Sequence, residues 1–251
     1  MSTINIDGIK LYFEKYGTKG DKVILLHGWG QNTEMMAFIG EHLKSHFVVY
    51  NIDFPGFGKS EEPNDVWGCE DYTNLIHEFC LKKKIDNPIF IAHSFGCRIA
   101  IRYAYLYGAK KMVLTGAAGI RDKHDLMWYI KVYSYKLAKK ILSIKPLQKY
   151  RDILSKNAGS EDYRNTSGIM RQTFVKVVND DITDLLKDVE CETLLVFGEY
   201  DDATPVEKGK MMEKLMPNAA LVVFEGDDHY AYFHQANRFC LVLDAFLKGD
   251  K

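Results

Sequence analysis

The stretch Pro88–Ala100, P-I-F-I-A-H-S-F-G-C-R-I-A, decides the fold. It begins with an apolar, β-branched run, Ile89–Ala92, that is typical of a short buried strand. From Cys97 onward the apolar residues have helical spacing, so the strand turns directly into a helix at Ser94. A small residue stands two positions before and two positions after the serine, which lets the strand and the helix pass close together.

A corner of this kind holds its central residue in a strained backbone conformation, at a cost of about 1–3 kcal/mol. The side chain then projects alone above the end of the sheet, at the amino end of a helix. Pro88–Ala100 therefore predicts a nucleophile elbow, G-x-S-x-G, with Ala92 in the first glycine position.

Outward from this stretch, short apolar strands alternate with helices. Strands are predicted at Ile4–Ile6, Lys10–Tyr16, Val23–Leu26, Phe47–Ile52, Met112–Thr115, Thr193–Phe197 and Ala220–Phe224, and helices at Met35–Leu43, Tyr72–Lys83 and Asn237–Leu247. The first two strands flank Asp7-Gly8, a turn dipeptide, and read as a hairpin. The alternation predicts an α/β fold with a mostly parallel central sheet and helices on both faces.

The alternation stops over residues 121–189, where strand pattern is weak. Helices are predicted there at Met127–Ser143 and Met170–Leu186, joined by a polar stretch at Asn157–Gly168. We therefore expect a core of residues 1–120 and 190–251. Residues 121–189 would form a helical lid over the carboxyl ends of the strands, where open α/β sheets bind their ligands.

Two later loops could complete a catalytic site around Ser94. A serine hydroxyl needs a base to take its proton, and the base needs an acceptor that fixes its tautomer. The strand Thr193–Phe197 is followed by a loop with Asp201, and the strand Ala220–Phe224 is followed by His229. Because the carboxyl ends of parallel strands meet at one edge of a sheet, we expect these three side chains to meet there.

The motifs of this chain resemble those of the α/β-hydrolase family over nearly its whole length. They are H-G-x-G (His27–Gly30), D-x-P-G-x-G-x-S (Asp53–Ser60), the elbow, G-x-x-D-x-x-x-P (Gly198–Pro205) and G-x-x-H (Gly226–His229). The resemblance implies an α/β-hydrolase fold with an inserted helical lid, and a serine hydrolase with Ser94 as nucleophile, Asp201 as acid and His229 as base. It also implies an oxyanion hole made by the backbone N–H groups of Phe95 and Trp29, and no metal or organic cofactor.

Other residues compete for the acid role. Asp202 adjoins Asp201 in sequence. The family motif sets the number of residues between the glycine, the acid and the proline of this loop, and that spacing favours Asp201. Some members of the family carry the acid after the preceding strand, where Asp122 is the candidate. The Trp29 side chain could line the pocket or serve as a packing residue.

The other histidines are read as structural. His93 adjoins the nucleophile, so its side chain should point away from the nucleophile's side and pack, while His27 should stabilise its loop by hydrogen bonding. His234 is expected in the helix that follows His229. The remaining ones, His42, His46, His77 and His124, show no metal-ligand spacing.

The lid helix has two interpretations. Aromatic and aliphatic residues alternate with lysines along it, so it could be an amphipathic flap that faces the substrate or a lipid surface, with Trp128 and Tyr129 as substrate contacts. It could equally be an ordinary helix that packs on the core. At its entry, Gly116–Gly119 would permit a hinge-like backbone change.

Composition limits the partners. A formal charge of −1 gives the chain as a whole no attraction to nucleic acid or to an anionic membrane. The five cysteines are scattered without C-x-x-C pairing, which favours reduced thiols and a cytoplasmic protein. No signal peptide and no apolar run of about 20 residues, the length of a membrane span, is recognisable. The pattern says nothing about oligomeric state.

The expected activity is hydrolysis of a small or medium carboxylic ester through an acyl-enzyme. Carbon–carbon bond hydrolysis, thioester hydrolysis and perhydrolase-like chemistry would use the same three residues. A non-catalytic ligand-binding scaffold is a third alternative, which a missing member of the triad would have indicated. Which substrate is bound does not follow from the fold.

Overall fold

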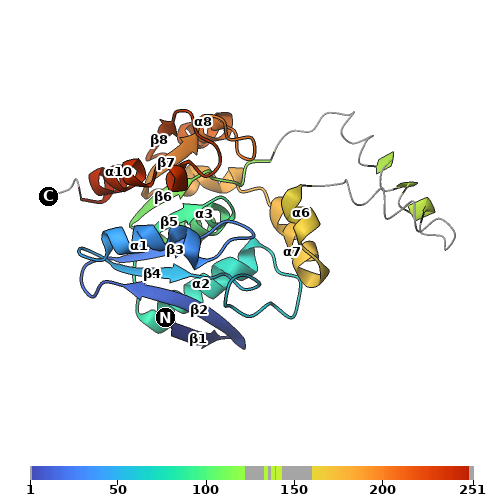
Figure 1. Cartoon of the computed structure of the whole chain (residues 1–251), viewed down its shortest axis with the longest axis horizontal. Coiled ribbons are helices and arrows are strands. Elements are labelled where there is room, and N and C mark those ends of the chain that lie inside the picture. Colours follow the sequence, from blue (N-terminus) through green and yellow to red (C-terminus); the bar gives the residue numbers. More distant parts are fainter. Residues whose placement is uncertain (1, 122–132, 135–136, 139, 143–159, 249–251) are drawn as a thin grey trace.

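The computed structural model describes residues 2–121, 133–134, 137–138, 140–142 and 160–248 (Figure 1). Its strands are β1 (Ser2–Ile6), β2 (Ile9–Tyr16), β3 (Lys22–Leu26), β4 (Val48–Ile52), β5 (Ile89–His93), β6 (Lys111–Thr115), β7 (Glu192–Gly198) and β8 (Ala219–Phe224). Its helices are η1 (Thr33–Met36), α1 (Ala37–Leu43), α2 (Cys69–Lys83), α3 (Phe95–Tyr107), α6 (Glu161–Asn165), α7 (Gly168–Val178), η3 (Thr183–Asp188), α8 (Val206–Leu215), α9 (Ala231–His234) and α10 (Ala236–Lys248).

The strands form one sheet in the order β1-β2-β4-β3-β5-β6-β7-β8. From β4 to β8 every neighbouring pair is parallel, whereas β1 and β2 are antiparallel to each other and β2 is antiparallel to β4. The predicted fold class and the predicted hairpin are therefore confirmed. In Figure 1 the carboxyl ends of the parallel strands point toward the side where α6 and α7 lie.

Helices cover both faces of the sheet because its strands are apolar on both sides. In β3, Ile24 and Leu26 face one core cluster, while Val23 and Leu25 face the other. The first cluster receives residues of α2, α3 and α8, and the second receives residues of α1, α9 and α10. Such near-continuous apolar strands are typical of a parallel sheet that is buried on both faces.

The helix predictions differ from the structure at one predicted helix and at the omitted helix α8. The helix expected over Met170–Leu186 ends at Val178, and the chain resumes as η3 at Thr183. Polar residues that favour turns over helix interiors lie between them, and Asp180 is held there by two arginines of α3: its carboxylate accepts two hydrogen bonds from Arg102, and its main-chain oxygen accepts one from Arg98. The second error is an omission, since α8 was not expected.

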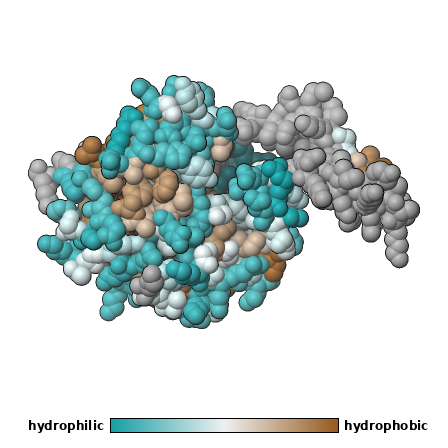
Figure 2. All heavy atoms as spheres, in the orientation of Figure 1, coloured by the Kyte–Doolittle hydropathy of each residue, from teal (hydrophilic) through white to brown (hydrophobic). Residues whose placement is uncertain are grey.

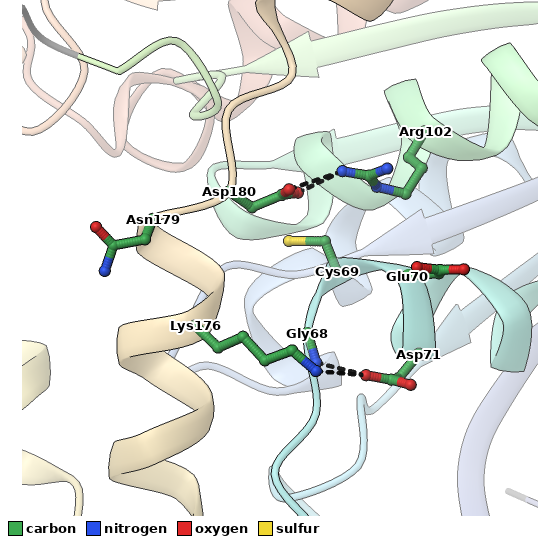
Figure 3. A pocket seen from close by; sticks show the side chains of 8 residues that line it. All are labelled: Gly68, Cys69, Glu70, Asp71, Arg102, Lys176, Asn179 and Asp180. Carbon is green, nitrogen blue, oxygen red and sulfur yellow. Dashed lines mark hydrogen bonds and ion pairs between the residues drawn. The ribbon is translucent and has the colours of Figure 1, made fainter.

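These contacts of Asp180 belong to a clamp that fixes α7 and the following turn to the core. Figure 3 shows it at a cavity of about 340 Å³ beside the amino end of α2. Arg102 pairs with Asp180 at 2.6 Å, and Lys176 of α7 pairs with Asp71 of α2 at 3.3 Å. Two ion pairs thus border the cavity, together with the carboxylate of Glu70.

Residues 160–189, which the sequence assigns to the lid, pack on the core. The Ile182 side chain is fully buried, and its N–H donates to the Gly119 carbonyl oxygen at 3.1 Å. The polar stretch Asn157–Gly168 contains the short helix α6, which Ser160 caps by accepting from the Tyr163 N–H. Most of the helix predicted over Met127–Ser143 lies outside the described residues, and the division into core and lid stays a prediction.

Two further observations bear on the class of protein. None of the helices in the described ranges has the length and apolar character needed to span a membrane. All five cysteines lie in those ranges, and none forms a disulfide, as expected. The face shown in Figure 2 is largely hydrophilic, and its apolar area lies near α1 and α10.

Candidate active site

Ser94 lies at the predicted corner between β5 and α3. Its backbone has φ 48° and ψ −106°, a region that side chains other than glycine rarely adopt, so the expected strain is present. The Ser94 N–H donates to the Thr115 carbonyl oxygen at 3.0 Å, and its own carbonyl oxygen accepts from Cys97 at 3.1 Å. These bonds hold the corner in place against the strain.

The close approach of α3 to β3 explains why the second small residue of the elbow is Gly96. A Cβ atom built on Gly96 would lie 2.3 Å from the carbonyl oxygen of Leu26. The helix α3 therefore passes β3 at a distance that only glycine permits, and this contact sets the position of the helix start under Ser94.

The loops after β7 and β8 bring Asp201 and His229 together. His229 Nδ1 lies 2.7 Å from Asp201 Oδ2, and the Asp201 residue is only 3% exposed. Asp202, its neighbour in sequence, is exposed and makes no such contact. His229 lines a cavity of about 620 Å³ that Ser94 also lines, so the three predicted residues meet at one site.

The Asp201 carboxylate is held by donors from its own loop. Its Oδ1 accepts from the N–H groups of Ala203 at 2.9 Å and Thr204 at 2.7 Å, and its Oδ2 accepts from Thr204 Oγ1 at 2.8 Å. Burial alone would raise the pKa of Asp201, but the hydrogen bond and charge of His229, together with the bonds from Thr204, lower it below its ordinary value. The carboxylate is therefore ionised and able to accept a hydrogen bond from the Nδ1–H of His229.

Thr204 was not singled out from the sequence. Its Oγ1 lies 3.2 Å from His229 Nδ1 and 2.8 Å from Asp201 Oδ2, so the hydroxyl contacts both members of the pair. Its position one residue before Pro205, within the acid loop, was the available signal.

The Thr204 hydroxyl should matter for activity because it holds the Asp201 oxygen that orients His229. Thr204→Val removes the hydroxyl at constant shape, and we expect kcat/KM for an ester to fall about tenfold, the size of one hydrogen bond to a charged group. Thr204→Ser should stay within about twofold of the wild type. Thr193→Val removes another buried hydroxyl at the opposite end of β7 and serves as the control. A fully active Thr204→Val enzyme would contradict the positioning role.

Gly116 is a second residue whose role the sequence did not reveal. A Cβ atom there would lie 2.9 Å from two ring atoms of His229 and 3.4 Å from Asp201 Oδ2, and the backbone has φ +52°. Gly119 likewise packs against the Ile182 side chain. The expected hinge at Gly116–Gly119 is instead a tightly packed turn, in which Gly116 makes room for the Asp–His pair.

Both predicted oxyanion donors border the same cavity. Phe95 is the first residue of α3, so its N–H has no partner within the helix and gains from the helix dipole. Trp29 lies in the loop after β3, and within the described ranges neither N–H donates to a protein acceptor. Trp29 combines the two roles that the sequence left open: it lines the cavity, and its ring packs edge-on against Phe95.

His27 stabilises this loop, as expected. Its Nε2 accepts from the Phe54 N–H at 3.0 Å, so its Nδ1 carries the proton and donates to the Gly28 carbonyl oxygen at 2.7 Å. Burial lowers the pKa of His27 to about 4, which keeps the ring neutral. In the next loop, Asp53 accepts from the N–H groups of Thr33 and Lys59, which accounts for the D-x-P-G-x-G-x-S motif.

His93 and His234 are the other two histidines near the site. His93 is fully buried and packs, but one of its neighbours is His229, with ring centroids 4.7 Å apart, so it does not point away from the site. Burial, and then the charge of His229, hold the pKa of His93 well below its ordinary value. His234 ends the short helix α9, the helix that follows His229, as expected, and it contacts Asp227.

The remaining predicted site residues lie outside the described residues. These are Trp128 and Tyr129, the expected substrate contacts, and Asp122, the alternative acid. From the described part of the insertion, α6 and α7 line the cavity, with Glu161 and Asp162 from α6 and Phe174 and Val177 from α7. Its lining thus combines apolar side chains with the polar groups around Ser94.

Known proteins resemble this chain over nearly its whole length. A family model described as the alpha/beta hydrolase family matches residues 23–240. The pimeloyl-[acyl-carrier protein] methyl ester esterase of Aliivibrio fischeri is 22% identical, over 94% of this chain and 97% of its own.

Solved structures agree on the fold. An esterase from Exiguobacterium antarcticum superposes with a TM-score of 0.74 at 24% identity, covering 97% of each chain. A meta-cleavage product hydrolase from Pseudomonas fluorescens superposes with a TM-score of 0.75 at 23% identity, covering 100% of this chain and 98% of its own.

Proposed function

Because the chain belongs to the α/β-hydrolase family, we propose that it is a serine esterase that cleaves small or medium carboxylic esters through an acyl-enzyme. One observation carries the proposal: Ser94, on its strained turn, lines the same cavity as the His229 that is hydrogen-bonded to Asp201. The esterase names of the relative from Aliivibrio fischeri and the structure from Exiguobacterium antarcticum support it.

In the proposed reaction, Ser94 Oγ attacks the ester carbonyl carbon while His229 takes the hydroxyl proton. Asp201 accepts a hydrogen bond from the Nδ1–H of His229, which keeps the proton on Nδ1 and leaves Nε2 free as the base. The charge on the former carbonyl oxygen is stabilised by the N–H groups of Phe95 and Trp29. The tetrahedral intermediate collapses, the alcohol leaves with the proton from His229, and water then hydrolyses the acyl-serine by the same steps.

A carbon–carbon bond hydrolase is the second candidate, since the similar structure from Pseudomonas fluorescens carries the name of a meta-cleavage product hydrolase. It would use the same three residues on a carbon leaving group. The cytoplasmic location, the small-molecule substrate and the substrate contacts of Trp128 and Tyr129 stay predictions.

A panel of p-nitrophenyl esters of graded acyl length tests the proposal. We expect saturable turnover with a preference for short or medium chains, and covalent labelling of Ser94 by a fluorophosphonate. Labelling without turnover of any ester, together with cleavage of a meta-cleavage product, would favour the second candidate. A chain that is neither labelled nor active would be a non-catalytic scaffold.

A further inference from the structure

The short helix α6 places two carboxylates at the catalytic cavity. Glu161 and Asp162 both line the cavity that contains Ser94 and His229. Asp162 Oδ1 lies 3.8 Å from the position that a Cβ atom on Gly30 would take. Since Gly30 follows Trp29, the Asp162 carboxylate lies beside the loop that carries one of the oxyanion donors.

These carboxylates have no cationic partner among the described residues. Among the described residues that line the cavity, Arg98 is the one arginine, and it donates to the main-chain oxygen of Asp180. With His229 neutral, as its role as base requires, the charged groups of the lining therefore sum to a negative charge.

The surroundings of Asp162 show that its charge acts on the site. Burial, and then the negative charge of Glu161, raise the pKa of Asp162 above its ordinary value, against the opposing influence of His229. The Asp162 side chain is itself exposed at the cavity, so its charge acts on neighbouring groups through a solvent-accessible site.

We propose that Asp162 sets the charge selectivity of this site, which would accept neutral or cationic esters and reject esters that carry a second anionic group near the scissile bond. The inference rests on the proposed ester hydrolysis and deepens it by naming the substrate class. A carboxylate on the acyl chain would approach an unpaired carboxylate in a lining whose described charged groups sum to a negative charge. Such like-charge contacts are a common way to discriminate between substrates of similar shape.

Two esters of equal chain length test this. p-Nitrophenyl butyrate is neutral, whereas mono-p-nitrophenyl succinate carries a carboxylate at the end of the acyl chain. The wild type should prefer the butyrate. Asp162→Asn, which keeps the shape, should raise kcat/KM for the succinate about tenfold, the order expected for two unit charges within about 6 Å at a partly solvated site. Because the butyrate carries no charge, its kcat/KM should change less than that of the succinate, and the ratio of the two values is the readout.

Two controls separate this effect from a general loss of charge or structure. Asp184→Asn neutralises an exposed carboxylate on η3 that does not line the cavity, and should leave the ratio of the two rates unchanged. High salt should narrow the wild-type preference but not that of Asp162→Asn, because salt screens charge–charge repulsion.

The outcomes are distinguishable from failure of the proposed function. Equal wild-type rates for the two esters, or equal changes of both rates in Asp162→Asn, would overturn the selectivity proposal while leaving ester hydrolysis intact. Should the wild type hydrolyse neither ester, the labelling rates of Ser94 with a neutral and a carboxylate-bearing fluorophosphonate report the same preference without turnover. A labelling ratio that Asp162→Asn does not change would then reject the proposal.

Discussion

Replacing Ser94 by alanine should lower kcat for ester hydrolysis by about 10⁶-fold, the loss typical for a triad nucleophile. The expectation follows from the Ser94 position at the corner of β5 and α3, beside the His229–Asp201 pair. Ester turnover, measured with enzyme purified away from any contaminating esterase, gives the answer. An alanine variant that keeps most of its activity would refute the acyl-enzyme mechanism.

A matched variant separates chemistry from stability. Ser94→Gly should be as inactive as Ser94→Ala, but glycine adopts φ 48° without the Cβ penalty of about 1–2 kcal/mol that other residues incur in the left-handed region. The glycine variant should therefore unfold at a higher denaturant concentration than the alanine variant. Equal stabilities of the two would show that the corner is not strained in solution.

Asp201→Asn should lower kcat by about 10⁴-fold, because an asparagine in place of the carboxylate stabilises the wrong tautomer of the histidine. Asp201 Oδ2 lies 2.7 Å from His229 Nδ1 and also accepts from Thr204, and among the described residues no other carboxylate is bonded to that ring nitrogen. Steady-state kinetics at neutral pH, with the fold checked by circular dichroism, measures the effect.

Asp202→Asn is the matched control for Asp201→Asn. It makes the same chemical change one residue along, on an exposed side chain, and should alter kcat by less than about twofold, as surface substitutions usually do. If the Asp202 variant lost activity and the Asp201 variant kept it, the assignment of the acid would be wrong.

The sheet and the position of the three central residues could be predicted because their signals are local. An apolar run that ends in a glycine- or proline-containing loop predicts both the strand and the end at which its loop lies, and Ser94, Asp201 and His229 each follow such a run. The strand order is not needed for this prediction, because the carboxyl ends of parallel strands lie at the same edge of a sheet in any order.

What could not be predicted depends on contacts between distant segments. Gly116 reads as a flexible residue in the sequence, but its role is to leave space for the His229 ring. The helix expected through Asp180 stops there because arginines of α3 hold that residue. Asp162 lies in a polar stretch with no motif, and only the packing of α6 beside the cavity reveals it.

The pairing of β6 with β7 has a consequence for how this protein can change over evolution. The two strands are neighbours from Lys111 and Glu192 to Thr115 and Val196, although residues 116–191 separate them in the chain. Closing a connection costs entropy that grows only with the logarithm of its length, about 0.6 kcal/mol for each doubling. Insertions and deletions in this connection therefore cost little away from its packed residues, such as Gly116 and Ile182, and the triad residues lie on turns outside it. New substrate preferences can be acquired there without disturbing the chemistry.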